Sequence, residues 1–94
     1  MKKVVLEVHI EVPKEDLAAL LVELPNHLSV TKNEAGCLEF QVKQRVSRPC
    51  VFDVYEEFEN KDAFDLHQSR VRESKWGEIN LRATRHYQVN QIDT

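Results

Sequence analysis

The chain has 94 residues, of which 41% are hydrophobic and 31% charged, and its formal net charge is −3. This length fits a single domain over residues 1–94, and the composition is that of a folded protein rather than a disordered one. The net charge is weakly negative and no cluster of lysine and arginine forms a stripe, so we expect no nucleic-acid partner. No apolar run is long enough to span a membrane and the start does not resemble a signal peptide, so we expect a cytoplasmic protein with no membrane partner.

The chain is small enough that association with a second copy would help it to stay folded. A domain of this length buries only about two-thirds of the surface that its unfolded chain exposes. Its two cysteines, Cys37 and Cys50, fall at opposite ends of an expected strand, about 40 Å apart at ~3.3 Å per residue. We therefore expect two free thiols, as in a reducing compartment.

The first third of the sequence predicts a strand followed by a helix. Residues 4–12 alternate strictly, and the apolar face of this strand consists of Val4, Leu6, Val8, Ile10 and Val12. Pro13 ends the strand, and the acidic residues that follow it favour the start of a helix. The buried stripe of this helix consists of Leu17, Leu20, Leu21, Leu24 and Leu28. Pro25 lacks a backbone donor, so we expect a kink or a restart near Asn26.

The rest of the chain predicts a hairpin, two helices and a last strand. The expected elements are a turn at 33–36, strands at 37–46 and 51–58, a helix from residue 61, a shorter helix around residues 76–79 and a strand at 84–92. Gly36 can supply a positive φ in the turn, and Leu38 and Phe40 share one face of the strand that follows. Asn60 is a good N-cap for the longer helix, which we expect to become irregular at residues 69–72.

The order β-α-β-β-α-β within about ninety residues is the plan of the ferredoxin-like fold. We therefore expect an α+β domain with a four-stranded antiparallel sheet and helices on one face. The other face of the sheet would carry Glu7, His9, Glu11, Asp53, Tyr55 and Glu57. Such a face is too polar for a core and too rich in tyrosine and aliphatic stems for a plain surface, so we expect a second copy to cover it in a homodimer.

Four segments carry a family resemblance when they are taken together and in order. They are Asn26-His27, the run Glu-Ala-Gly-Cys-Leu-Glu-Phe-Gln-Val at 34–42, residues 52–58 with Tyr55-Glu56 near the centre, and Ala-Phe-Asp-Leu-His at 63–67. They resemble the antibiotic biosynthesis monooxygenase (ABM) domain, and the likeness spans residues 4–76. The spacing agrees as well, because His27 stands seven residues before Glu34 and His67 nine before Trp76.

The resemblance implies a dimeric α+β barrel, in which two ferredoxin-like units pack sheet to sheet and each holds a pocket between sheet and helices. The family includes quinol and polyketide monooxygenases that need no cofactor, haem-degrading enzymes, an isomerase of a phosphorylated signalling compound and proteins without an assigned activity. Membership alone therefore does not fix the reaction.

Two departures from the family pattern bear on which cofactor and which substrate to expect. The haem-degrading branch uses an asparagine on the first strand and a tryptophan, where this chain has Val8 and His67, so we exclude haem and expect no cofactor. Family members often carry a Thr-Pro-His-Phe-like segment after the helical histidine, where this chain has Arg70-Val71-Arg72-Glu73. Charge thus replaces a histidine and an aromatic wall of the pocket.

An oxygenase without metal or flavin needs a base, an apolar cage and a donor for developing negative charge. His67, on the apolar side of its helix, titrates in the right range to act as the base, and His27 could line the far end of the pocket. We expect both to be catalytic, although His67 could instead bond a backbone carbonyl and His27 could be solvated at a frayed helix. The expected substrate-binding residues are Asn26, Tyr55, Glu56, Phe64, Trp76 and Arg72.

Some of these residues have alternative roles. Tyr55 could lie at the subunit interface and Trp76 in the core, while Glu56 could orient a histidine or pair with an arginine or a backbone donor. The four histidines lack the spacing of metal ligands, so we expect no metal site.

The leading hypothesis is a homodimeric ABM-type monooxygenase that acts on a small aromatic or quinol-like molecule. The first rival is a dimer that binds a small ligand without catalysis, which the charged segment at 70–73 favours. The second is an isomerase of a small phosphorylated signalling compound, in which Arg70 and Arg72 would hold the phosphate.

Overall fold

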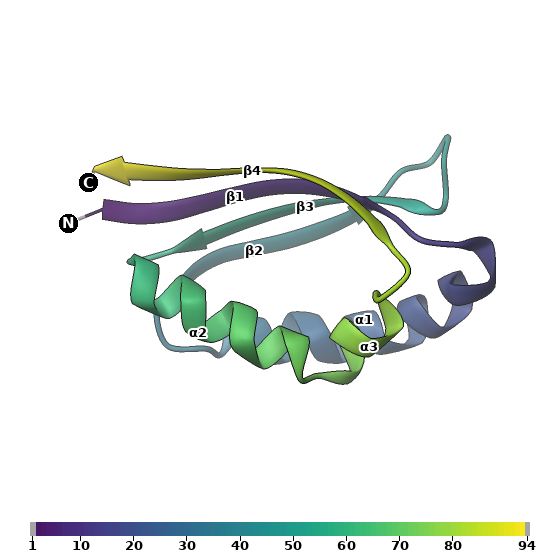
Figure 1. The fold of residues 1–94 in the computed structure, drawn as a ribbon, viewed down its shortest axis with the longest axis horizontal. Helices are drawn as coiled ribbons and strands as arrows, with labels where there is room; N and C mark the ends of the chain where they lie inside the picture. Colours follow the sequence, from purple (N-terminus) through teal and green to yellow (C-terminus); the bar gives the residue numbers. More distant parts are fainter. Residues whose placement is uncertain (1, 94) are drawn as a thin grey trace.

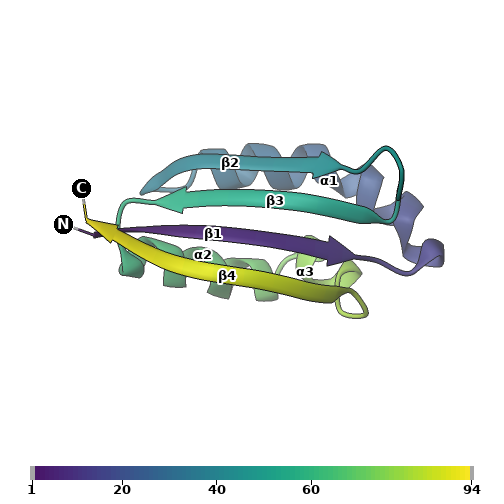
Figure 2. The same cartoon turned by 90° about the horizontal axis from the view of Figure 1, so that it is seen from above.

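The computed structural model describes the backbone of residues 2–93 and the side chains of residues 2–86. Four strands form one antiparallel sheet in the order β2-β3-β1-β4, and the helices cover one face of it (Figures 1 and 2). The elements are β1 (Lys2–Glu11), η1 (Lys14–Asp16, one 3₁₀ turn), α1 (Leu17–Lys32), β2 (Cys37–Gln44), β3 (Val51–Phe58), α2 (Lys61–Arg72), α3 (Lys75–Ile79) and β4 (Thr84–Asp93). This is the expected α+β, ferredoxin-like fold.

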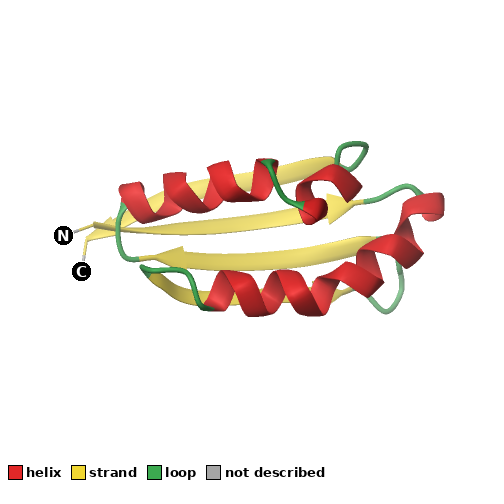
Figure 3. Cartoon of the chain, turned by 90° about the horizontal axis from the view of Figure 1, so that it is seen from below, coloured by secondary structure: helices red, strands yellow, loops and turns green. Residues whose placement is uncertain are grey.

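Strand β1 lies inside the sheet and pairs with β3 on one side and β4 on the other. Its alternation places Leu6 and Ile10 on the helix-facing side, where both are buried, while Glu7 is exposed on the other side. One buried cluster joins the sheet to α1 and α3 and consists of Ile10, Val12, Leu20, Phe52 and Trp76. Helix α1 lies over the β2 side of the sheet, and α2 and α3 lie over the β1 and β4 side (Figures 2 and 3).

The two expected junction signals are confirmed. Gly36 adopts a φ of 84° in the turn that leads into β2, where an L side chain would be strained. Asn60 caps α2, because its side chain accepts a hydrogen bond of 2.8 Å from the backbone N–H of Ala63. The chain therefore passes from β3 to α2 within two residues, which fixes where the face of α2 points.

Helix α1 runs from Leu17 to Lys32 without a break, so the expected restart near Asn26 is wrong. Pro25 lies inside the helix on its exposed side. The carbonyl of Leu21, which loses its hydrogen bond to residue 25, also belongs to an exposed residue and can bond to water. A proline on the solvent side is thus tolerated.

The buried stripe of α1 agrees only in part with the expected one: Leu20 is buried, and Leu17 and Leu24 are partly buried against the core cluster. Its fully buried residues are Leu20, His27 and Thr31, whereas Leu21 is 39% exposed. The stripe therefore follows the i, i+7, i+11 positions and includes a histidine and a threonine that a leucine pattern does not reveal.

A β-bulge changes the first part of β2. The register with β3 shifts between Cys37 and Glu39, so Leu38 is an extra residue that faces no partner. Leu38 is consequently 55% exposed and does not share the buried face of Phe40, contrary to expectation. The strand also ends at Gln44, two residues before its expected end.

The segment at 69–72 is the last turn of α2 rather than an irregular one. Helix α3 then begins at once, because the Ser74 hydroxyl accepts a hydrogen bond from the N–H of Gly77 at 3.2 Å. Gly77 lies so close to the Val71 carbonyl that a Cβ at this position would overlap the oxygen. This close approach brings Trp76 and the end of α2 together.

Candidate functional site

A cavity of about 580 Å³ lies between the helix-facing side of the sheet and the helices. This volume is typical of a small-molecule site. Its apolar walls come from β1, β2 and β3 and from Phe64, Val71 and Trp76. The polar and charged residues that line it are His27, Glu56, His67, Gln68, Arg72, Asn80 and Arg85.

Most of the predicted site residues meet in this cavity. The six that line it are His27, Glu56, Phe64, His67, Arg72 and Trp76. Asn26 does not, because it is exposed on α1 and its Nδ2 donates to Glu23 at 2.7 Å. Tyr55 lies on the opposite face of the sheet, outside the cavity.

His67, on α2, is 2% exposed and lies between two carboxyl groups. Its Nδ1 is 2.7 Å from Oε1 of Glu34, and its Nε2 is 3.4 Å from Oε1 of Glu56. An ionised carboxylate can only accept a hydrogen bond, so the short contact assigns the proton of the neutral ring to Nδ1. Nε2 is then the basic nitrogen, and it lies on the side of Glu56, which also lines the cavity. The alternative bond to a backbone carbonyl is not formed.

Glu34 stands in the turn after α1 and is held from both sides. Arg70 donates from Nη2 to Oε1 of Glu34 at 2.9 Å and to the Thr31 hydroxyl at 3.1 Å. Burial would raise the pKa of Glu34, but the hydrogen bonds from Arg70 and His67 outweigh it, and the pKa is lowered. Glu34 is therefore ionised and its charge is balanced by Arg70.

Glu56, on β3, is 6% exposed and faces His67 rather than an arginine or a backbone donor. Burial, together with the nearby charge of Glu34, raises the pKa of Glu56 to about 8. Near neutral pH the side chain is thus mostly a neutral carboxylic acid. At 3.4 Å its oxygen makes no well-aligned hydrogen bond to His67, and Oε1 is left without a partner.

His27 is buried, with 4% of its surface exposed, so the alternative that it is solvated at a frayed helix is wrong. Its ring stacks on Trp76 with centroids 4.3 Å apart and planes 2° apart, and it meets the edge of Phe40 at 5.4 Å. Burial lowers the pKa of His27 to about 3, and burial also lowers the pKa of His67 despite the opposing hydrogen bond from Glu34. Both rings are therefore neutral at pH 7.

Buried polar atoms without a partner gather around this cavity. Among residues 2–86, five such side-chain atoms occur, and three of them belong to residues that line it: His27 Nδ1, Glu56 Oε1 and Asn80 Oδ1. Asn80 uses its Nδ2 to donate to the Trp76 carbonyl at 2.7 Å. Buried polar groups are nearly always paired in folded proteins, so three unpaired atoms on one cavity mark positions where an ordered water or a polar group of a ligand would bind.

Sequence reasoning missed four polar residues of the site: Glu34, Gln68, Asn80 and Arg85. Glu34 lies within the run that carries the family resemblance, seven residues after His27. The sequence therefore marked this position, but it did not reveal that the Glu34 side chain contacts His67. Asn80 and Arg85 follow the short helix α3, where no periodic pattern marks the inward side.

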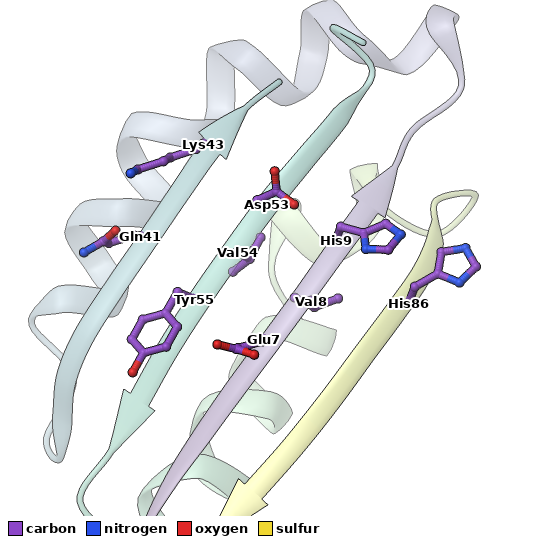
Figure 4. A pocket seen from close by; sticks show the side chains of 9 residues that line it. All are labelled: Glu7, Val8, His9, Gln41, Lys43, Asp53, Val54, Tyr55 and His86. Atoms are coloured by element: carbon purple, nitrogen blue, oxygen red, sulfur yellow. The ribbon is translucent and has the colours of Figure 1, made fainter. Parts of the chain in front are cut away.

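The opposite face of the sheet carries a second, shallower hollow of about 460 Å³ (Figure 4). Tyr55 and Glu7 lie on it, together with His9 and His86, whose rings stack at 4.8 Å across β1 and β4. Arg45 holds Asp53 through two hydrogen bonds of 2.8 Å. This hollow offers polar and aromatic contact surface but no buried acid–base pair.

The described part of the chain offers no metal-binding group, no disulfide and no helix that could span a membrane. Within it, no three histidine, cysteine, aspartate or glutamate side chains converge as a metal-binding group. Cys37 and Cys50 are both free thiols, as expected. None of the described helices is long and apolar enough to cross a membrane.

Comparison with known proteins gives one family. A family model described as antibiotic biosynthesis monooxygenase (ABM) matches residues 3–76. Similar solved structures include proteins from Bacteroides thetaiotaomicron (20% identity, TM-score 0.76, covering 98% of this chain and 87% of that one), Nitrosomonas europaea (16%, 0.73, 94% and 88%) and Deinococcus radiodurans (21%, 0.68, 97% and 91%). Each of the three is provisionally named an antibiotic biosynthesis monooxygenase, and at these identities the likeness shows the fold alone. No protein of curated function matches the sequence significantly.

Proposed function

The chain belongs to the antibiotic biosynthesis monooxygenase family, and from this premise we propose that it oxidises a small aromatic, quinol-like substrate with dioxygen and without a cofactor. The observation that carries the proposal is the arrangement of His67 between Glu34 and Glu56 in the wall of a largely apolar cavity. A cavity with apolar walls, in which the neutral ring of His67 is held in one orientation by Glu34, suits the removal of a phenolic proton.

In the proposed reaction, Nε2 of His67 accepts the proton of a substrate hydroxyl. Glu34 keeps the other proton on Nδ1 and stabilises the imidazolium that forms, as a carboxylate does for the histidine of a catalytic triad. Arg70 keeps Glu34 ionised by its hydrogen bond of 2.9 Å. Glu34 and Arg70 are thus positioning residues, and His67 is the proposed catalytic base.

The deprotonated substrate then supplies the electrons. It passes one electron to dioxygen, and the phenoxyl radical that forms combines with superoxide through a ring carbon to form a carbon–oxygen bond. The resulting peroxide takes the proton back from His67 and becomes a hydroperoxide. Loss of the proton on that carbon and cleavage of the O–O bond release water and leave a carbonyl, so a phenol and dioxygen give a quinone and water.

We propose that the substrate ring lies against Phe64 and Trp76, with Arg72 at one end. His27, held by its stack on Trp76, would hold a second substrate oxygen through its unpaired Nδ1. Protonated Glu56 would donate a hydrogen bond to an oxygen of the substrate, which leaves Nε2 of His67 free to accept the substrate proton. Asn26 and Tyr55 lie outside the cavity and have no part in this arrangement.

The isomerase hypothesis relied on two arginines to hold the phosphate, and one of them is already engaged elsewhere. It required Arg70 and Arg72 to hold a phosphate, but Arg70 is engaged by Glu34 and Thr31 and does not line the cavity. Ligand binding without catalysis remains the rival, and an activity measurement decides between the two.

Oxygen uptake with a panel of hydroquinones and dihydroxynaphthalenes tests the proposal. His67→Gln should lower the turnover number by at least about 100-fold, the usual effect of losing a general base. Asp65→Asn, on the exposed face of the same helix, is the matched control and should leave uptake unchanged. No uptake by the wild type with any member of the panel, or uptake that is insensitive to His67→Gln, would contradict the proposal.

We further propose that the protein is a cytoplasmic homodimer in which two sheets pack face to face. Support comes from the sheet face opposite the helices, where a half-buried Tyr55 and the His9–His86 stack offer a surface that a second copy could cover. The two free thiols suit a reducing compartment. Sedimentation equilibrium at micromolar concentration tests the dimer, and a stable folded monomer would refute it.

A further inference from the structure

The arginines of this chain fall into two groups. Six are present, and four of them pair with carboxylates at 2.6–3.0 Å: Arg45, Arg48, Arg70 and Arg82. These four are accounted for as structural ion pairs, and none of the four lines the cavity.

The other two, Arg72 and Arg85, are the arginines that line the cavity. Arg72 donates from Nη2 to the Ser69 hydroxyl at 3.1 Å, and Arg85 donates from Nη2 to the Asn80 carbonyl at 3.3 Å. Both partners are uncharged. Among residues 2–86, neither guanidinium has a carboxylate within ion-pairing distance, so two full positive charges stand at the cavity without a counter-charge.

Nothing else in the cavity offsets these charges. His27 and His67 are neutral because burial lowers the pKa of each, and Glu56 is mostly protonated near neutral pH. Glu34 is ionised, but Arg70 balances it. Arg72 and Arg85 are therefore the lining residues that carry a full charge near neutral pH, and a pair of positive charges attracts anions.

The two arginines reach the cavity from separate elements. Arg72 lies in the last turn of α2, and Arg85 lies near the start of β4, beside Asn80 at the end of α3. Both side chains are exposed, so their guanidinium groups are at the open side of the cavity, while the His27–Trp76 stack forms an aromatic wall inside it. A ligand that fits has a flat ring at one end and an acidic group at the other.

We propose that Arg72 and Arg85 form an anion-binding subsite, and that the natural ligand is a flat aromatic molecule that carries a carboxylate or phosphate group. The planar guanidinium matches both groups through paired hydrogen bonds. The inference rests on the proposed function only in taking this cavity as the substrate site; binding does not depend on any reaction with oxygen.

Isothermal titration calorimetry with three naphthalene probes tests the subsite. 1-Naphthol supplies the ring with a neutral hydroxyl, 1-hydroxy-2-naphthoate adds a carboxylate, and 1-naphthyl phosphate carries a phosphate in place of the hydroxyl. We expect the wild type to bind at least one charged probe about tenfold or more tightly than 1-naphthol, the effect of one charge-assisted hydrogen bond. The tighter of the two charged probes identifies the acidic group.

The variants assign this preference to the two arginines. Arg72→Gln and Arg85→Gln should each weaken the charged probe about tenfold and leave 1-naphthol unchanged. Arg48→Gln, which removes an exposed arginine paired with Glu11, is the matched control and should change neither. Equal affinity for charged and uncharged probes, equal weakening of both by the arginine variants, or no binding of any probe would overturn the subsite.

The same measurements separate this inference from the proposed function. A preference for the charged probe without oxygen uptake from any quinol would refute the monooxygenase and leave the subsite standing. Oxygen uptake from neutral quinols without a preference for acidic probes would refute the subsite and leave the monooxygenase standing.

Discussion

Replacing Glu56 with glutamine should stabilise the protein, and increasingly so as the pH rises. The side chain keeps its size, but it can no longer ionise inside the cavity. In the unfolded chain Glu56 loses its proton near pH 4.5, whereas in the folded protein it keeps the proton up to about pH 8. Between these values the folded state binds more protons than the unfolded state, so Glu56 lowers the stability of the wild type as pH rises from 4.5 to 8.

The two pKa values set the size of the effect. They differ by about 3.5, which at 1.36 kcal/mol each corresponds to an upper value of about 5 kcal/mol. Relaxation and water entry around the carboxylate reduce this, and we expect Glu56→Gln to be more stable than the wild type by about 2–4 kcal/mol at pH 8. Near pH 4.5 the two proteins should be almost equally stable.

Urea unfolding at several pH values between 4.5 and 8.5 measures this difference, with the protein concentration held constant because association changes apparent stability. Glu73→Gln, which removes an exposed carboxylate at the end of α2, is the matched control and should show no such growth with pH. A difference between Glu56→Gln and the wild type that stays constant from pH 4.5 to 8.5 would refute the account of Glu56 as a buried neutral acid.

Three further predictions concern stability. Gly77→Ala should cost about 2 kcal/mol or more, because its Cβ would overlap the Val71 carbonyl; an unchanged melting temperature would contradict this packing. The pKa of His27 is about 3 in the folded protein and 6.5 in the unfolded chain, so the stability that its neutral ring contributes above pH 6.5 is lost as the pH falls toward 3. In urea titrations, the difference in free energy of unfolding between wild type and His27→Gln should therefore shrink over this range. A constant difference would argue against a buried neutral ring. Asn60→Ala removes the cap on the Ala63 N–H and should lower the free energy of unfolding by about 1 kcal/mol; no loss would mean that the cap is not formed in solution.

Local sequence rules were enough for much of this fold. The alternation at 51–58 marks β3 with its observed bounds, and Asn60 marks the start of α2, because both signals depend on neighbouring residues only. They failed where tertiary context decides. Pro25 does not interrupt α1 because it faces solvent, and Leu38 leaves the buried face through a bulge that nothing in its own sequence reveals.

The same division applies to the candidate site. The helical spacing that placed His67 on the apolar face of α2 is a local property, and the structure does bring it into a cavity with His27. The role of Glu34 could not be predicted, because its contact with His67 joins residues 33 positions apart. Arg70 shows the converse: it looks like an anion-binding residue in the sequence, and only its contact with Glu34 reveals that it is already engaged.

Isotope labelling tests the central proposal most directly. A quinol that supports oxygen uptake is incubated with the wild type under ¹⁸O₂ in ordinary water, and the product is analysed by mass spectrometry before its carbonyl oxygens exchange. The proposed reaction predicts that each product molecule gains one ¹⁸O atom and that His67→Gln suppresses this gain. A quinone without ¹⁸O, or with an added oxygen that comes from water, would contradict a monooxygenase.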